Sequence, residues 1–342
     1  MAVGFGKSRG VTILPMTETA REFVLSGIRQ QRADISPRFT EAEVGRVIVT
    51  QFAQSEIQVV VDAELNQRDV FIFFSNEPPI NERIAELRLV MQIAKRSSAD
   101  RITVVAPQGP YTRGEKQDQY HGSVAFRDFA DCLNFYTACF ITCDMHDPVA
   151  IEFSNEPHHM ISLRHVALAE ARKIPGICIA VSADAGGVKR VRKFAKALEL
   201  SDGRILDKVV IDKQRTGNDD NAMAEQCYGA DVDGCDVIII DDEAMTLGTL
   251  ISATKVLKNA GARKIYAFAY HGVLAGPAIE RLAKSDITEL IVTNTVPVSQ
   301  AKIAGAKGKL RVVPIEEYVI EAARRWYAGE SLNTMKEYAY RD

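Results

Sequence analysis

Two adjacent carboxylates stand at the end of an apolar run, and a small polar loop follows them. The run 235–240 ends at Asp241 and Asp242, and the segment 243–249 leads into a predicted helix. In an open α/β sheet, ligands bind beyond the carboxyl ends of strands, where paired acids hold sugar hydroxyls or a metal. Threonine hydroxyls, a glycine and the N–H groups of a helix start favour an anion. The pattern indicates a sugar phosphate site, with a plain helix cap as the alternative.

A second candidate for chemistry is the polar stretch 212–233, which we expect to be a long exposed loop between two strands. Lys213 and Arg215 open it. An arginine binds phosphate oxygens through its planar fork, and a lysine acts as a point charge. Because long loops inside compact domains are usually functional or disordered, a closing catalytic loop is the favoured interpretation. A solvated charge cluster is the alternative.

Short apolar runs alternate with amphipathic stretches along the chain, which is typical of βαβ units and of parallel sheets covered on both faces. The predicted strands are 47–52, 69–74, 101–106, 138–144, 176–182, 208–212, 236–241, 264–269 and 289–293. The predicted helices are 81–98, 188–200, 246–261, 277–285 and 316–327. The fold class is therefore α/β.

The chain of 342 residues is long enough for two domains, each with its own core. The strand and helix rhythm restarts near residue 165, after the irregular stretch 146–159. We expect an N-terminal domain over 1–164 and a C-terminal domain over 165–310. A helical tail over 311–342 would cap either domain or form an oligomer contact.

The amino-acid composition limits the classes of partner that the protein is expected to bind and the compartment in which it is expected to work. Lys plus Arg is 42 against 45 for Asp plus Glu, so no global basic field points to nucleic acid or a membrane surface. No window of about 18 apolar residues occurs, and the apolar run near the N-terminus is too short for a signal peptide. The six cysteines lie mostly in apolar runs and read as reduced thiols. We expect a cytoplasmic protein.

Four segments carry a family resemblance. Residues 237–250 resemble the phosphoribosyl-diphosphate motif of phosphoribosyltransferases and ribose-phosphate diphosphokinases, in which two acids precede a Thr-Gly-Gly-Thr loop. Residues 181–190 resemble the glycine-containing loop of the diphosphokinases, 144–146 their Asp-Leu-His element, and 212–215 the start of their mobile catalytic loop. By order and spacing, the chain is identified as a divergent member of the diphosphokinase family.

This resemblance implies two phosphoribosyltransferase-type domains with the active site between them. It implies Mg²⁺-dependent transfer of the β,γ-diphosphoryl group of ATP to the anomeric hydroxyl of ribose 5-phosphate, with release of AMP. The implied site residues are His146 and Asp184 for the metal, Lys213 and Arg215 for catalysis, Phe52, Gln54, Glu56 and Arg113 for ATP, and Asp241, Asp242, Thr246, Gly248 and Thr249 for the ribose phosphate.

The resemblance also implies a homo-oligomer, a dimer or a hexamer, because in the family the element matched by residues 52–56 reaches the active site of a neighbouring subunit. For Phe52 by itself, plain core packing is the alternative. For His146, the alternative is a satisfied histidine at a strand end.

The phosphate loop departs from the family pattern. Asp-Thr-Gly-Gly-Thr is replaced by residues 245–249, in which Met245 stands for the acid and Leu247 for a glycine. A leucine at such a position is expected to enlarge or reshape the pocket. The acceptor is therefore either ribose 5-phosphate, the family default, or a sugar with a substituted phosphate such as ADP-ribose, which would belong to NAD-linked metabolism. His158 and His159 serve a new acceptor group or are a surface loop pair.

Two other classes of function stay open. A phosphoribosyltransferase would use the acid pair and its loop without ATP. A catalytically silent regulatory subunit would keep the fold and lose catalytic side chains, and the presence of His146, Asp184, Lys213 and Arg215 counts against it.

Overall fold

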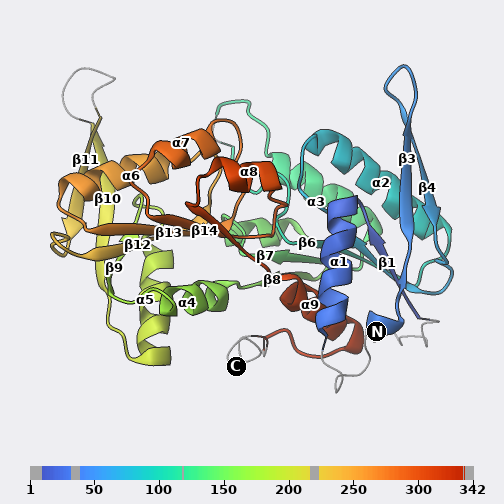
Figure 1. The fold of residues 1–342 in the computed structure, drawn as a ribbon. Helices are drawn as coiled ribbons and strands as arrows, with labels where there is room; N and C mark the ends of the chain where they lie inside the picture. The colour runs from blue at the N-terminus through green and yellow to red at the C-terminus, as the bar shows by residue number, and fades with distance from the viewer. Residues whose placement is uncertain (1–9, 32–38, 118, 216–222, 334, 336–342) are drawn as a thin grey trace. The chain divides into compact units, whose positions relative to one another are not determined.

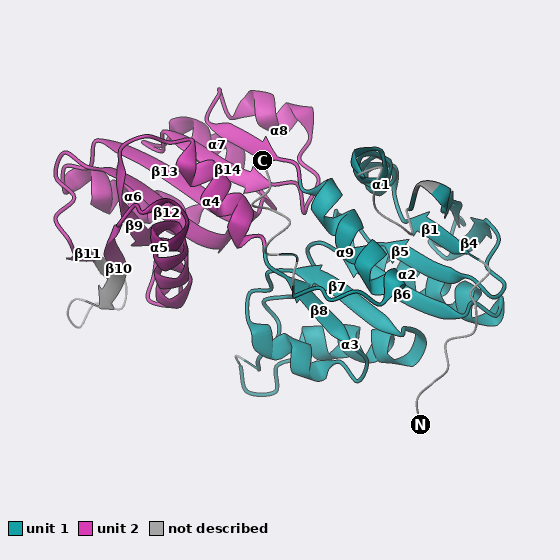
Figure 2. Cartoon of the chain, turned by 90° about the horizontal axis from the view of Figure 1, so that it is seen from below, with its two compact units in different colours: residues 1–162, 315–342 teal, residues 163–314 magenta. Residues whose placement is uncertain are grey.

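The protein divides into two compact units (Figure 2), shown by a computed structural model that describes residues 10–31, 39–117, 119–215, 223–333 and 335. Unit 1 consists of Met1–Ser162 and Ile315–Asp342, and unit 2 of Leu163–Pro314. The segment expected as a separate tail thus belongs, from Ile315 onward, to unit 1.

Unit 1 is built on a six-stranded sheet in the order β2-β1-β5-β6-β7-β8, with parallel neighbours throughout (Figure 1). A two-stranded hairpin, β3–β4, leaves the sheet after β2. The elements are β1 (Val11–Pro15), α1 (Glu18–Gln30), the 3₁₀ turn η1 (Phe39–Glu41), β2 (Glu43–Val44), β3 (Arg46–Gln51), β4 (Ile57–Asp62), β5 (Asp69–Phe73), α2 (Ile80–Arg96), β6 (Arg101–Ala106), α3 (Ala125–Tyr136), β7 (Cys139–Cys143), the 3₁₀ turn η2 (Pro148–Phe153), β8 (His158–Ile161) and α9 (Glu316–Ala328).

Helices cover both faces of this sheet. Val70 and Val104 on one face belong to a core that includes Phe129 of α3 and the apolar side of α2. On the other face, Trp326 of α9 donates a hydrogen bond to Thr103 Oγ1 at 3.0 Å. Because both faces are buried, the central strands read as continuous apolar runs rather than as alternating ones.

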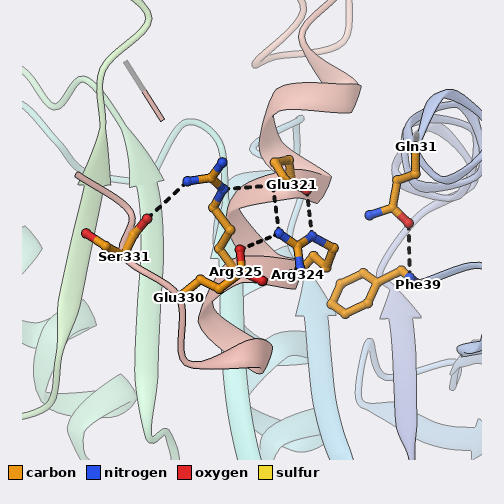
Figure 3. A network of polar contacts seen from close by, with 7 residues as sticks. All are labelled: Gln31, Phe39, Glu321, Arg324, Arg325, Glu330 and Ser331. Carbon is orange, nitrogen blue, oxygen red and sulfur yellow. Dashed lines mark hydrogen bonds and ion pairs between the residues drawn. The ribbon is translucent and has the colours of Figure 1, made fainter. Parts of the chain in front are cut away.

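Helix α9 is held by a buried ion network (Figure 3). The guanidinium of Arg324, 2% exposed, donates to Glu321 at 2.7 and 2.8 Å and to Glu330 at 2.9 and 2.6 Å. A buried charge is tolerated only when it is paired and hydrogen-bonded, and this one is paired on two sides. The network fixes the segment that follows α9 against the end of that helix.

Unit 2 is built on a seven-stranded sheet in the order β11-β10-β9-β12-β13-β14-β15, parallel except for β11. Its elements are α4 (Arg164–Arg172), β9 (Ile177–Ser182), α5 (Val188–Asp202), β10 (Asp207–Arg215), β11 (Met223–Gly229), β12 (Asp236–Glu243), α6 (Gly248–Asn259), β13 (Lys264–His271), α7 (Ala278–Lys284), β14 (Glu289–Thr293), α8 (Gln300–Gly305) and β15 (Leu310–Val313).

The core of unit 2 also lies on both faces of its sheet. Leu250 and Leu257 of α6 and Leu282 of α7 pack with Val181 and Val237 on one face. Helix α5 contacts β9, β10 and β12, and Figure 1 shows α4 and α5 on the side of the sheet opposite α6 and α7. The expected class, mainly parallel sheets flanked by helices in two units, is confirmed.

Two expectations about irregular segments were wrong. The stretch 212–233 is not one long loop, because β10 and β11 pair as antiparallel strands from Val209↔Gly229 to Arg215↔Met223. Residues 158–161 form β8, which pairs with β7, so the predicted irregular stretch 146–159 overlaps the first two residues of a strand. In both cases polar residues occur in a strand at the edge of a sheet, β11 or β8, where one long side of the strand is open to water. The apolar pattern of a buried strand is therefore absent from the sequence.

Other structural features bear on the compartment and on metal binding. The six cysteines are free thiols. No helix within the described ranges is long and apolar enough to cross a membrane. Nor do the described residues contain a group of three or more His, Cys, Asp and Glu side chains placed to hold a metal ion.

Candidate functional site

The strand order of unit 2 contains a switch point between β9 and β12. The chain leaves β9 through α5 to β10 on one side, and it later places β12 on the other side of β9. Open parallel sheets bind ligands at such a point, beyond the carboxyl ends of the strands. Asp241 and Asp242 lie in the last residues of β12, and Asp184 lies in the loop after β9. The structure thus brings these three predicted residues to one edge of the sheet.

Arg190 joins the two acids. This residue of the first turn of α5 places Nη1 3.2 Å from Asp241 Oδ1 and Nη2 3.1 Å from Asp242 Oδ1. The side chains of Asp241 and Asp242 are 20% and 7% exposed. Partly buried carboxylates need such a partner, since an unpaired charge there would be costly.

Burial nevertheless dominates the ionisation of Asp241. Its desolvation, together with the hydrogen bond and charge of Asp242, raises its pKa to about 7, and the positive charge of Arg190 acts in the opposite direction. A carboxyl whose pKa is strongly raised beside a second acid is typical of functional sites. Such a pair offers oxygens that accept hydrogen bonds from neighbouring hydroxyl groups of a sugar.

The loop between β9 and α5 is shaped by its own side chains. Gly187 N donates to Asp184 Oδ1 at 3.0 Å, and Ser182 Oγ donates to the carbonyl of Asp184 at 2.7 Å. A Cβ on Gly187 would lie 2.5 Å from Ser182 Oγ, so a side chain there would displace the hydroxyl that bonds to Asp184. Asp184 itself is exposed. Its carboxylate therefore shapes the loop while facing solvent.

In the loop after the acid pair, the residue that replaces the glycine of the family pattern has a backbone conformation that glycine usually adopts. Leu247 has φ 60° and ψ 12°, in the left-handed region, and immediately precedes α6. Its side chain is 3% exposed and belongs to the core of unit 2. The expectation that Leu247 reshapes the phosphate pocket is wrong, because the side chain points into the core.

The residues around Leu247 present polar groups. Thr246 and Gly248 are exposed, and Thr249 is half-buried. The first N–H groups of a helix have no intrahelical partner, so the start of α6 offers backbone donors beside these side chains. The loop therefore offers hydrogen-bond donors to an anion.

In unit 1, two predicted residues lie after neighbouring strands. Arg113 follows β6 and His146 follows β7, and both are exposed. Their segments are tied by an ion pair of 2.5 Å between Lys116 Nζ and Asp147 Oδ2. The hydrogen bonds from Lys116 and from the backbone of Val149 lower the pKa of Asp147. The structure therefore brings Arg113 and His146 to the same edge of the sheet.

The predicted adenine element belongs to a different sheet of unit 1. Phe52, Gln54 and Glu56 form the turn of the β3–β4 hairpin, which projects from unit 1 (Figure 1). Phe52 is 47% exposed, so the core-packing alternative is wrong. Gln54 Nε2 donates to Glu56 Oε2 at 2.9 Å. An exposed aromatic ring and an amide and carboxylate pair at a hairpin tip suit contact with another surface or a ligand.

Two further predictions meet different outcomes. Lys213 and Arg215 lie on β10, in register with Glu225 and Met223 of β11, but their side chains lie outside the described residues. His158 and His159 are not a surface loop pair. They are half-buried in β8, where burial lowers the pKa of His158 to about 4, and His158 Nε2 lies 2.9 Å from Thr142 Oγ1. Both histidines are therefore part of the sheet of unit 1.

Sequence reasoning assigned no role to two arginines of this site. Arg190 follows the glycine-containing loop by three residues, so its place in the first turn of a helix at the switch point was a usable signal. Arg281 of α7 donates through Nη1 to the carbonyl of Thr246 at 2.9 Å. No local pattern marks it, because the contact joins segments 35 residues apart.

Comparison with known proteins decides the family. Residues 24–136 match the family described as the N-terminal domain of ribose phosphate pyrophosphokinase, and residues 225–337 the one described as phosphoribosyl synthetase-associated domain. The ribose-phosphate pyrophosphokinase of Aquifex aeolicus is 35% identical over 291 residues, which cover 84% of this chain and 90% of that protein. The chain belongs to the ribose-phosphate pyrophosphokinase family.

Other pyrophosphokinases extend this match. Ribose-phosphate pyrophosphokinase A of Dictyostelium discoideum is 33% identical over 312 residues, covering 90% of this chain and 94% of the relative. The crystal structure of phosphoribosylpyrophosphate synthetase from Mycobacterium smegmatis superposes with a TM-score of 0.81 at 25% identity and covers 94% of this chain and 100% of that one. The likeness therefore spans both units.

Proposed function

We propose that the protein is a transferase that moves the β,γ-diphosphoryl group of ATP onto the anomeric hydroxyl of ribose 5-phosphate. The products are phosphoribosyl diphosphate and AMP. The observation that carries this proposal is the acid pair Asp241 and Asp242, clamped by Arg190 beside the loop that begins α6, in a chain of the pyrophosphokinase family.

The acceptor sugar is bound by residues of unit 2. Asp241 and Asp242 accept hydrogen bonds from two ribose hydroxyls, while Thr246, Gly248 and Thr249 lie around the 5-phosphate with the first N–H groups of α6. Binding at both ends of the sugar fixes its anomeric hydroxyl, so that binding energy is used for orientation.

The reaction itself is a displacement at the β-phosphorus of ATP. The anomeric oxygen forms a bond to that phosphorus. The bond between the β-phosphorus and the oxygen that bridges it to the α-phosphate breaks, and AMP leaves with this oxygen and the electron pair. The hydroxyl proton is released to water. We assign Lys213 and Arg215 to the charge that develops on the moving diphosphoryl group.

Magnesium fits the residues assigned to it in part. Asp184 offers an exposed carboxylate, the hard oxygen ligand that Mg²⁺ prefers, and water would complete the shell. His146 is an exposed imidazole, a less usual ligand for this ion. When bound, Mg²⁺ would neutralise triphosphate charge.

ATP recognition is assigned to unit 1. Arg113 would meet the triphosphate, and the hairpin tip with Phe52, Gln54 and Glu56 would stack and read the adenine. The hairpin forms a two-stranded sheet of its own that projects from the unit, whereas Arg113 follows β6 of the six-stranded sheet. We therefore propose a homo-oligomer, a dimer or a hexamer, in which the tip serves a neighbouring subunit.

No observation now favours the other functions. The case for ADP-ribose depended on a pocket reshaped by Leu247, whose side chain lies in the core. A phosphoribosyltransferase or a silent subunit is not favoured by relatives that carry the pyrophosphokinase name over 84% and 90% of this chain.

The test is AMP release from ATP and Mg²⁺ with four acceptor conditions: ribose 5-phosphate, ribose, ADP-ribose and none. We expect AMP only with ribose 5-phosphate. Turnover only with ADP-ribose would replace the proposed acceptor, and no turnover with any acceptor would overturn the proposed reaction.

A further inference from the structure

The loop around Leu247 is bound to the segment that leads into α7. Leu274 N donates to the carbonyl of Ala244 at 2.9 Å, and Ala275 N donates to that of Met245 at 2.9 Å. These two hydrogen bonds fix the start of α7 relative to the loop. As a consequence, side chains in the first turns of α7 have a defined position beside the proposed phosphate site.

Arg281 is the side chain that reaches the loop. Its Nη1 donates to the carbonyl of Thr246 at 2.9 Å and lies 3.7 Å from the position of a Cβ on Gly248. The guanidinium therefore lies against the exposed residues of the loop, at the two neighbours of Leu247 just before and at the start of α6.

The charge of Arg281 is not used by an acid of the described residues. None of the salt bridges among the described residues includes Arg281. On the same helix, by contrast, Lys284 pairs with Glu280 at 2.6 Å. A guanidinium carries five N–H donors, and one bond to a carbonyl leaves donors for an oxyanion.

Phosphate binding at the loop also requires a positive charge on the side of the sheet where α7 lies. Asp241, Asp242 and Glu243 lie directly before it and repel a phosphate dianion. Arg190 compensates the first two from α5, on the other side of the sheet from α7. Arg281 stands beside Thr246 and Gly248, where the phosphate itself would bind.

We propose that Arg281 binds the 5-phosphate of the acceptor and thereby selects phosphorylated over free sugars. This inference rests on the proposed function, whose acceptor site it completes. Arg281 uses one side of its fork to hold the loop through Thr246 and the other side to donate to phosphate oxygens. The loop bond sets the orientation of the fork before the substrate arrives.

Three variants test this assignment: R281Q, R281K and, as the matched control on the same helix, K284A. Glutamine keeps an N–H group for the Thr246 carbonyl but lacks the charge. We expect R281Q to raise KM for ribose 5-phosphate on the order of 10–100-fold, the size of a lost charged hydrogen bond. KM for ATP should stay unchanged, R281K should lie between, and K284A should match the wild type.

Two results would overturn the assignment. One is an unchanged KM for ribose 5-phosphate in R281Q, and the other is an equal rise in KM for ATP, which would indicate a structural role. Titration calorimetry with ribose 5-phosphate in the absence of ATP provides a readout besides turnover. If the wild type does not turn over, the proposed reaction fails, yet weaker binding by R281Q would still support Arg281 and equal binding would still refute it.

Discussion

Arg190 Nη2 lies 3.1 Å from Asp242 Oδ1, an ion pair that connects the helix after β9 to the end of β12. The same guanidinium reaches Asp241 at 3.2 Å. One cation thus orients both acids at the switch point of the sheet. The affinity for any ligand that binds to the acid pair should therefore depend on Arg190.

Acceptor binding should depend on pH through Asp241. Its pKa is raised to about 7, mainly by burial, so this carboxyl is protonated below that pH and ionised above it. The ionised pair accepts hydrogen bonds from ribose hydroxyls, and we expect KM for ribose 5-phosphate to fall as pH rises from about 6 to about 8. Initial rates over this range test it. A KM that rises with pH would contradict the assignment.

Replacing Arg190 by Gln should move that pH dependence to higher pH. The positive charge of Arg190 lowers the pKa of Asp241, so its loss raises that pKa further. We also expect KM for ribose 5-phosphate at pH 7 to rise on the order of 10-fold, the cost of a lost charged hydrogen bond. The exposed Lys196 of the same helix supplies the control, K196A. A higher KM with an unshifted pH profile would show that Arg190 is only structural.

Leu247→Gly should lower stability and leave the acceptor unchanged. Removing the buried side chain costs about 2–5 kcal/mol. Relief of the left-handed backbone returns about 1–2 kcal/mol, so the net loss lies between about 0 and 4 kcal/mol, with about 2 kcal/mol at the middle of the two ranges. Chemical unfolding measures the loss, and rates with ribose 5-phosphate and ADP-ribose measure the acceptor preference. A changed preference between the two acceptors, with no loss of stability, would show that the Leu247 side chain lines the acceptor pocket.

Lys213→Ala should reduce kcat by on the order of 10²-fold or more, because a cation that acts on the transition state is lost. The dissociation constants of both substrates should change little. Lys208 lies exposed at the start of the same strand, and K208A is the matched control. If K213A turned over as fast as K208A, the residue would have no place in the mechanism.

Gly27→Ala should destabilise unit 1 where α1 packs on α9. A Cβ at Gly27 would lie 2.5 Å from Ile320 Cγ1 and 2.7 Å from the carbonyl oxygen of Glu316. Overpacking of this kind costs about 1–3 kcal/mol, only partly offset by the helix propensity of alanine. Thermal unfolding should show a lower Tm than for E22A, an exposed position on α1. An equal Tm would mean that the two helices separate without cost.

The sequence predicted most strands that are buried on both faces, although it did not predict β1, a fully buried strand of unit 1. The predicted strand 289–293 coincides with β14, and the predicted helix 188–200 with most of α5, because apolar periodicity reports burial. The edge strands β8 and β11 were missed, since they are short or polar on one side. Their strand state comes from pairing with β7 and β10, which local sequence does not encode.

The sequence predicted which residues of the candidate site lie together at strand ends, but not how all of their side chains are placed. Asp241 and Asp242 lie at the end of a buried strand and Asp184 follows another, and the rule that ligands bind at strand carboxyl ends predicted that they lie together. The direction of the Leu247 side chain was not predictable, because it depends on the left-handed backbone at that residue. Nor was the contact of Arg281 with Thr246, which depends on how α7 packs after β13.

The most direct test of the central claim follows the two transferred phosphoryl groups. ATP carrying a heavy-isotope label in both its β- and γ-phosphates is incubated with the enzyme, Mg²⁺ and ribose 5-phosphate, and the sugar product is analysed by mass spectrometry. We predict a sugar phosphate that has gained one diphosphate with both labels, together with unlabelled AMP in equal amount. A sugar carrying only the γ label, with ADP as the second product, would contradict diphosphoryl transfer.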